Sequence, residues 1–204
     1  MPNSLGDYYS QSTEEMHIVP FFSGRRGKFL DVGAYNGKDF SNTYRLALLG
    51  WSGVCIEPSP MIYPQLKKLY ENNPKIKTIN IALGDRDGDL DFFDSPHAVG
   101  TARSEHYEKW KNYKPDVFKK TVVPMLSFRT FYVSAPSEYQ FVSIDTEGMD
   151  YQIVKDMAPY LAEMKTELIC IEYTYDSREI YDVLRDVGFN LIHQNTENIL
   201  LRRA

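Results

Sequence analysis

The chain has 204 residues, a net charge of −5 and a pI of about 5.4. This length allows one α/β domain with a full core and is too short for two domains of ordinary size. The acidic balance argues against a duplex-binding surface spread over the whole molecule. The apolar runs are far shorter than the ~20 residues that span a bilayer, and the first residues lack the layout of a signal peptide. A cytoplasmic protein without a membrane span is therefore expected.

Two cysteines, Cys55 and Cys170, each lie inside an apolar, strand-like run. Both are expected to be buried free thiols in a reducing compartment. The sequence contains no Cys/His cluster with the spacing of a zinc site, and no metal ligand is assigned.

Strands and helices are predicted to alternate along most of the chain. A leading turn and a short helix are expected within residues 1–27, with Thr13 as the candidate N-cap. Near-continuous apolar runs and the apolar periodicity between them predict the main elements. The predicted strands are 28–32, 53–57, 76–83, 141–145 and 168–172, and the predicted helices are 39–50, 60–72, a helix from about 151, and 178–187.

The final predicted strands, residues 190–193 and 198–202, are close enough to form a hairpin around Asn195. This hairpin would put an antiparallel strand at the end of the sheet. Together the elements predict one doubly wound α/β domain over residues 1–204, with a mostly parallel sheet that is covered on both faces. Ligands of such sheets bind beyond the carboxyl ends of the strands.

Residues 84–140 interrupt this alternation with two extra predicted strands and a polar, aromatic stretch between them. An insertion of this kind between sheet elements is expected to roof the site. A role in packing alone stays open.

The turn after the first strand, FLDVGAYNGKDF at residues 29–40, carries the first chemical signal. Gly33 and Gly37 suit a backbone that approaches a ligand at the start of a helix. The dinucleotide fingerprint G-x-G-x-x-G is incomplete, because no glycine stands two residues after Gly33. Asp31, just before the turn, would repel a phosphate and suits an ammonium or hydroxyl group. The pattern favours a ligand with a positively charged amino acid end.

A second acid, Glu57, ends the next predicted strand, where an acid commonly binds ribose hydroxyls. NAD and S-adenosylmethionine (SAM) both contain a ribose, so Glu57 predicts a nucleoside without choosing between them. The alternative is that both acids only cap helices. Two acids that end successive strands beside a glycine turn argue against it.

Four segments, DVGAYNGKDFSNT, GWSGVCIEPSP, NIALGD-x-x-G and VSIDTEGMD, together resemble the FkbM family of SAM-dependent methyltransferases. The similarity runs in this order from about Ser10 to the C-terminus. It implies a class I methyltransferase fold, which is Rossmann-like, with a seven-stranded sheet whose last strand is antiparallel. It also implies SAM as the cofactor and O-methylation, often of a sugar hydroxyl.

By position, the resemblance also assigns the cofactor site. It implies that Glu57 holds the ribose hydroxyls with Pro58 beside it, and that Asp145 faces the methyl group. The other implied cofactor-binding residues are Asp31, Gly33, Ala34 and Gly37 in the turn, and Ala82 and Leu83 against the adenine. The similarity is weakest at residues 94–120, where the acceptor would be chosen.

The IDTEGMD segment, residues 144–150, offers several carboxylates just past a strand end. Asp145 or Glu147 is the expected proton acceptor for an attacking hydroxyl. Crowded carboxylates raise each other's pKa or share a bridging cation, and both outcomes stay open here. The alternative is a helix N-terminus that carries acids because they favour the helix dipole.

The inserted region contributes the substrate candidates His97, Arg103 and Trp110. Aromatic residues recur at every third position around Trp110, which places them along one side of a helix. Such rings can stack on a sugar, and the neighbouring lysines suit an anionic glycan. Packing of this helix onto its own domain is the more common use of such a stripe.

The sequence thus favours a SAM-dependent O-methyltransferase that acts on a hydroxyl, with a saccharide or small-molecule acceptor. A nicotinamide-dependent oxidoreductase is the first alternative, and the incomplete glycine fingerprint and Asp31 argue against it. A SAM-binding module without turnover is the second. Such a module is expected to lack the carboxylates that follow the fourth strand.

Overall fold

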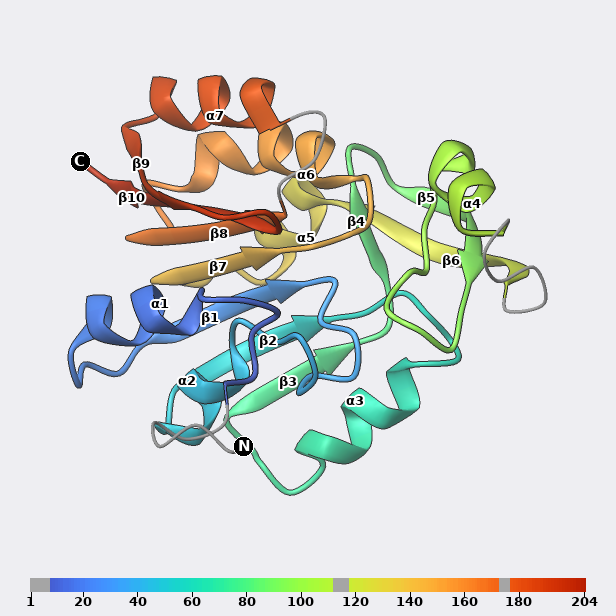
Figure 1. Cartoon of the computed structure of the whole chain (residues 1–204), viewed down its shortest axis with the longest axis horizontal. Coiled ribbons are helices and arrows are strands. Elements are labelled where there is room, and N and C mark those ends of the chain that lie inside the picture. The colour runs from blue at the N-terminus through green and yellow to red at the C-terminus, as the bar shows by residue number, and fades with distance from the viewer. Residues whose placement is uncertain (1–7, 112–117, 173–176) are drawn as a thin grey trace.

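The computed structural model describes residues 8–111, 118–172 and 177–204 (Figure 1). Its centre is a seven-stranded sheet with the order β3-β2-β1-β7-β8-β10-β9. The neighbouring pairs among β3, β2, β1, β7 and β8 are parallel, and β10 runs antiparallel to both of its neighbours. The strands are β1 (Lys28–Val32), β2 (Ser52–Ile56), β3 (Ile76–Ile79), β7 (Phe141–Ile144), β8 (Leu168–Glu172), β9 (Phe189–Gln194) and β10 (Asn198–Arg203).

Helices cover both faces of this sheet, which confirms the predicted doubly wound architecture. Because strand side chains alternate, Phe29 of β1 packs against one helix layer and Leu30 against the other. The first layer is α1 (Glu15–Phe22), α2 (Tyr44–Leu48) and α3 (Tyr63–Tyr70). The second is α5 (Phe128–Ser134), α6 (Asp150–Met157) with the 3-10 turn η1 (Ala158–Tyr160), and α7 (Ser177–Asp186).

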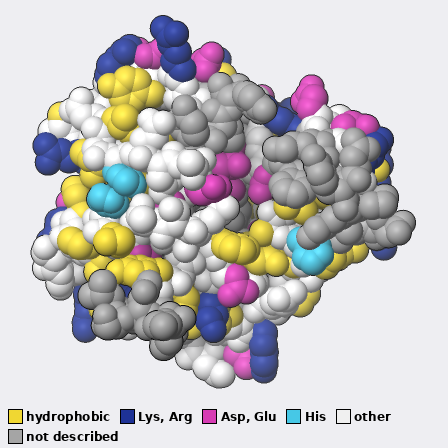
Figure 2. All heavy atoms as spheres, viewed as in Figure 1, with side chains coloured by type: hydrophobic (Ala, Val, Ile, Leu, Met, Phe, Trp, Pro, Cys, Tyr) yellow, Lys and Arg dark blue, Asp and Glu magenta, His cyan; other side chains and the backbone are white. Residues whose placement is uncertain are grey.

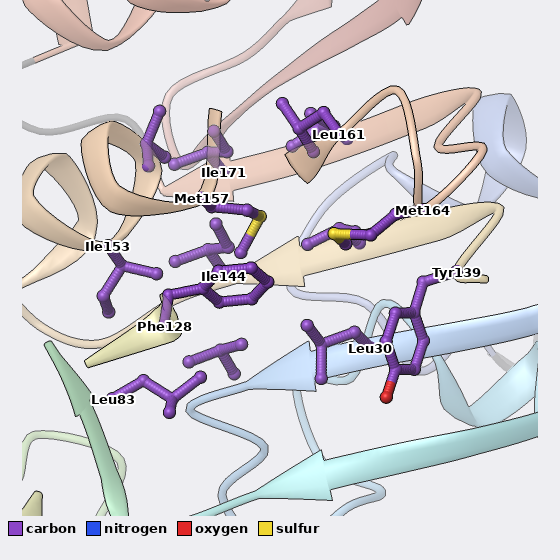
Figure 3. Close-up of a cluster of buried hydrophobic side chains, with 14 of the residues drawn as sticks. Leu30, Leu83, Phe128, Tyr139, Ile144, Ile153, Met157, Leu161, Met164 and Ile171 are labelled. Atoms are coloured by element: carbon purple, nitrogen blue, oxygen red, sulfur yellow. The ribbon is translucent and has the colours of Figure 1, made fainter. Parts of the chain in front are cut away.

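The larger core fills the space between the sheet and the second helix layer. Figure 3 shows Phe128 of α5 and Met157 of α6 lying against strand residues such as Leu30 and Ile144. All four are at most 1% exposed. Strands that are buried on both faces need near-continuous apolar runs, and this is why the sequence identified them. Cys55 and Cys170 are buried and free, as expected.

A second sheet of three strands stands beside the main one (Figure 1). Its order is β4-β6-β5, with β4 parallel and β5 antiparallel to β6. Its elements, with the helix that follows β5, are β4 (Ala82–Gly84), β5 (Gly88–Asp94), α4 (Ser104–Lys111) and β6 (Lys119–Ser127). The insertion predicted at residues 84–140 thus builds β5, β6, α4 and α5, while β4 begins just before it.

The prediction of one strand over residues 76–83 is wrong. The run breaks at Asn80, so that β3 stays in the main sheet and β4 joins the small one. The Asn80 side-chain amide donates to the carbonyls of Glu57 at 2.8 Å and Pro58 at 3.0 Å. This amide fixes the place where the chain leaves the main sheet.

Three further expectations are corrected. The helix predicted at 39–50 is only Tyr44–Leu48, because residues 39–43 form an irregular segment. Thr13 does not cap α1, since its hydroxyl lies 3.3 Å from the His193 ring. The hairpin forms, but the antiparallel strand β10 lies between β8 and β9 and not at the sheet's edge. Across the described ranges, no helix has the length and apolar character needed to cross a membrane.

Candidate active site

A cavity of about 560 Å³ opens beyond the carboxyl ends of β1, β2, β7 and β8. It lies where the strand order reverses between β1 and β7, the usual ligand site of a doubly wound sheet. Leu90, Phe92, Ser95, residues 97–100 and Ala102 of the insertion line its other side. Figure 2 shows acidic side chains gathered in the hollow near the middle of this face.

Strand register explains why the acids meet there. Asp31 pairs with Cys55 on one side and with Ser143 on the other, so that these side chains point to the same face of the sheet. Glu57 comes two residues after Cys55, just past the end of β2, and therefore lies on the same face. Asp145 follows β7 in the same way, and both residues line the cavity.

The glycine turn touches the backbone of Asp145, which directly follows β7. A Cβ at Gly33 would lie 1.7 Å from the backbone oxygen of Asp145, and Gly33 has φ +82°. Gly33 and Ala34 line the cavity, and their amides donate to the carbonyl of Ile56 at 2.9 and 3.0 Å. Gly37 is absent from the cavity wall. It packs against α3, where an added Cβ would meet Leu66 at 2.6 Å.

Asp31 is buried beside this turn and is 5% exposed. The Thr43 hydroxyl donates to its Oδ2 at 2.6 Å. Burial raises the pKa of Asp31 to about 6, and the Thr43 hydrogen bond opposes that rise. A ligand that brings positive charge or donor groups would stabilise its ionised form.

Glu57 is held from both sides by backbone amides. The amide of Tyr35 donates to Oε2 and that of Ser59 to Oε1, each at 2.8 Å. Burial nevertheless raises the pKa of Glu57 to about 8, and the carboxylates of Asp94 and Asp31 add to the rise. Both oxygens are thus fixed in place, and Glu57 lines the cavity.

The segment that leads into the small sheet builds an apolar wall of the cavity. Ile81, Ala82 and Leu83 line it at the start of the small sheet, with Pro58 nearby. Ala82 is 5% exposed and Leu83 is 3% exposed. A flat aromatic base would fit against such a wall.

The two aspartates of the segment 144–150, Asp145 and Asp150, have different surroundings. Asp150 is a structural carboxylate, because its oxygens accept from the amides of Thr146 at 3.0 Å and Gly148 at 3.2 Å. Asp145 lines the cavity instead. Burial raises the pKa of Asp145, and the charges of Asp150 and Asp31 raise it further.

Glu147 has φ +54°, and its carbonyl accepts a 2.8 Å hydrogen bond from Thr101 of the insertion. The conformation is uncommon for a residue with a side chain and is held by the surrounding contacts. Glu147 also lines the cavity.

A third carboxylate, Glu172, completes a cluster. One carboxylate oxygen each from Asp145, Glu147 and Glu172 lie within 4.8 Å of one another. Burial raises the pKa of Glu172, and the charges of Asp145 and Asp150 add to that rise. The three oxygens are close enough to share one cation, so their geometry is compatible with a cation that bridges the carboxylates.

The substrate candidates are spread out. His97 lines the cavity. Arg103 packs over the turn, where its Cδ lies 2.6 Å from the position of a Cβ on Gly148. Trp110 belongs to α4, and its side chain lies outside the described part of the structure.

Sequence reasoning missed several cavity residues. Glu172 ends β8 in the run LICIE, just as Glu57 ends GVCIE, and this parallel could have identified it. Asn42 lies in the segment that was expected to be helical. Glu197 reaches the site from the β9–β10 hairpin and accepts a 3.0 Å bond from Gln11. No periodic pattern points to Asn42 or Glu197.

The cavity fits the SAM that the sequence resemblance implies. Gly33 leaves room that any side chain would fill, and Glu57 offers two fixed oxygens beside an apolar wall. Two buried acceptor atoms in the cavity wall, Oδ1 of Asn42 and Oε2 of Glu172, have no donor among the described residues. Buried acceptors of this kind are expected to be satisfied by a ligand or by water.

Comparisons with known proteins agree with this geometry. Residues 31–191 match the family described as the methyltransferase FkbM domain. A solved ribosomal protein L11 methylase from Lactobacillus delbrueckii subsp. bulgaricus has a TM-score of 0.50 at 11% identity, over 93% of this chain and 77% of that chain. The METTL16 methyltransferase domain gives 0.51 at 13% identity, over 93% and 64%. At such low identities the likeness shows the fold alone.

No curated protein matches the chain in sequence.

Proposed function

Because the chain belongs to the FkbM family of SAM-dependent methyltransferases, we propose that it transfers the methyl group to a hydroxyl of a saccharide or a glycosylated molecule. Its fold is the Rossmann-like fold of class I methyltransferases. The observation that supports the hydroxyl acceptor most directly is Asp145, a carboxyl with a raised pKa that lines the cavity where the strands end.

The cofactor is S-adenosylmethionine, which supplies a methyl group on a positively charged sulfur. The proposed contacts follow from the geometry of the cavity. Glu57 accepts hydrogen bonds from the ribose hydroxyls, and Ala82 and Leu83 pack against the adenine. Asp31 lies beside the glycine turn and attracts the ammonium end.

Asp145 is the proposed proton acceptor. An alkyl hydroxyl keeps its proton until it attacks, so a carboxylate that takes the proton during attack is sufficient. The raised pKa of Asp145 brings this group closer to the pH at which it works. Asp150 holds the backbone of the turn and keeps Asp145 in position.

The charges in the cavity argue against a nucleic acid acceptor. Carboxylates line it, whereas no lysine or arginine is found among its described lining residues. Phosphate groups are bound by basic side chains and helix N-termini. A polyhydroxylated acceptor without phosphates is compatible with this lining.

The proposed domain organisation is a single methyltransferase domain in which the region of about 84–140 roofs the site. Leu90, Phe92 and the segment 97–100 all line the cavity from this region. The Thr101–Glu147 hydrogen bond joins it to the turn that carries the proposed base. Substrate choice is therefore expected to depend on the roof.

Transfer from isotope-labelled SAM to a panel of free sugars and oligosaccharides would test the proposal, with mass spectrometry locating the methyl group. Asp145→Asn should lower kcat at least ~100-fold and leave the Kd for SAM nearly unchanged. The matched control is Asp89→Asn, on the exposed side of β5. Absence of transfer to every hydroxyl in the panel, or an Asp145→Asn enzyme with full activity, would contradict the proposal.

A further inference from the structure

Glu172 has no role in the mechanism above, although it lines the cavity close to the proposed base Asp145. It follows Ile171, which pairs with Ile144 of β7, so that Glu172 comes next to Asp145 across the sheet. On its other side it pairs with Asn198 of β10. A residue at the centre of the sheet has a fixed backbone, and its carboxyl is therefore held next to the proposed base.

The Oε2 atom of Glu172 is buried and accepts no hydrogen bond from the described residues. A structural acid would be expected to show donors of the kind that hold Asp150. A buried oxygen without a donor is costly unless a ligand or water supplies one. Glu172 is thus a better candidate for contact with a ligand than for support of the fold.

A second orphaned acceptor lies in the same cavity on a different element. Asn42 is 6% exposed, and its Oδ1 also has no donor within the described ranges. Its Nδ2 donates to the Ser143 hydroxyl at 3.4 Å, two residues before Asp145. With Glu172 ionised, both unsatisfied atoms are acceptors, so the group that satisfies them must donate hydrogen bonds.

We propose that Glu172 is a specificity-determining residue: it accepts a hydrogen bond from a hydroxyl or ammonium group of the acceptor, and with Asp145 it excludes acceptors that carry a phosphate or carboxylate near the methylated position. This proposal rests on the function proposed above, which places the transferred methyl group of SAM beside Asp145, and it adds which acceptors the site selects. It runs against the anionic glycan that the lysines near Trp110 suggested.

The charges of Glu172 and Asp145 determine which acceptors are expected to bind most tightly. Two carboxyl groups a few ångströms apart in a buried site raise each other's pKa, and a third negative group would raise the cost further. An ammonium group relieves this repulsion, and a neutral hydroxyl leaves it unchanged. Acceptors with an amino group are therefore expected to bind most tightly, neutral acceptors less tightly, and anionic acceptors least tightly.

The first experiment uses sinefungin, a SAM analogue with an amine at the position of the transferred methyl group. Calorimetry in the presence of EDTA would give Kd values for sinefungin, SAM and S-adenosylhomocysteine. Sinefungin should bind the wild type about tenfold more tightly than S-adenosylhomocysteine, the worth of a charge-assisted hydrogen bond. Glu172→Gln should remove most of this advantage and leave the SAM to S-adenosylhomocysteine ratio unchanged. Glu179→Gln, exposed on α7, is the matched control.

The second experiment needs no variant and covers the case in which Glu172→Gln fails to fold. Calorimetry would measure the Kd values of glucosamine, glucose and glucuronate for the wild type loaded with S-adenosylhomocysteine, with and without Mg²⁺. Binding in the order glucosamine, glucose, glucuronate supports the proposal. Tighter binding of glucuronate overturns it, and if this occurs only with Mg²⁺ it points to a bridging cation instead.

Two results of the sinefungin experiment would also overturn the proposal, and a third result separates it from the saccharide assignment. A sinefungin advantage that persists in Glu172→Gln means that Glu172 does not face the transferred group. A SAM to S-adenosylhomocysteine ratio that falls together with the sinefungin advantage means that Glu172 serves the cofactor. If no sugar is methylated while sinefungin behaves as expected, the saccharide assignment fails and the role of Glu172 stands.

Discussion

At the scale of single residues, the site depends on close approach and on buried charge. Gly33 is the clearest case, because its Cα lies against the backbone of Asp145 and no side chain fits between them. Asp31 and Glu57 are buried acids whose pKa is raised by burial. Sequence alone identified all three as candidates, since glycine and acids at strand ends have few other uses in such a turn.

Gly33→Ala should be far more destabilising than an ordinary glycine substitution. The new Cβ would come within 1.7 Å of the Asp145 oxygen, and backbone on both sides would have to move. Gly188→Ala is the matched control, because Gly188 has φ +88° and open space around it. The control isolates the conformational cost, ~1–2 kcal/mol.

Urea denaturation of both variants measures the difference. Gly33→Ala should lose at least ~2 kcal/mol more than Gly188→Ala, as expected when a variant forces a clash. SAM binding should be lost in Gly33→Ala and kept in Gly188→Ala. Equal losses of stability would mean that the turn and β7 are not in contact in solution.

At the scale of elements, the sequence predicted the strands well and their connections less well. Strands buried on both faces leave an unbroken apolar signal, and each predicted strand of the main sheet forms, although the run 76–83 stays in that sheet only as far as Ile79. Whether an apolar run stays in one sheet depends on tertiary hydrogen bonds, such as those from Asn80. The short α2 also has a local cause, because Phe40 within the predicted helix has φ +62°, a conformation that no right-handed helix contains. Glu172 was overlooked although a predicted strand ends on it, because the order of the strands, which puts β8 beside β7, is known only once the sheet is known.

Asn80→Ala should loosen the point where β3 ends and β4 begins. The variant leaves the carbonyls of Glu57 and Pro58 without their donor, at a cost of ~1–3 kcal/mol. SAM binding should weaken as well, because Glu57 would lose a fixed backbone. Calorimetry and urea denaturation would measure both effects. Asn72→Ala, on an exposed residue after α3, should change neither, and an unchanged SAM affinity in Asn80→Ala would contradict the expectation.

At the scale of the whole molecule, a cavity lined by acids makes the stability of the ligand-free protein depend on pH. The ordinary pKa values are 3.8 for Asp31 and 4.5 for Glu57, and in the folded protein they rise to about 6 and about 8. The folded state therefore keeps protons that the unfolded chain has released. The stability that these groups contribute is complete below about pH 4 and is lost as the pH rises through 6 and 8.

The Tm of the ligand-free protein should thus fall by at least ~5 °C between pH 5.5 and 8.5. Glu57→Gln should flatten this fall, so that the Tm of the variant relative to wild type increases with pH. Calorimetric scans without SAM would measure it, and Glu71→Gln, on the surface after α3, is the matched control. A Tm that rises over this range in the wild type would show that the cavity acids are ionised at little cost.

The position of β10 has a consequence for synthesis on the ribosome. β8 and β9 emerge before β10, yet they do not pair with each other, because β10 fills the gap between them. Until residues 198–203 emerge, the apolar edge of β8 has no neighbour on that side, and unpaired edges invite association with other chains. The delay also keeps Glu172 at an open edge, so the acidic pocket closes only when the sheet is complete.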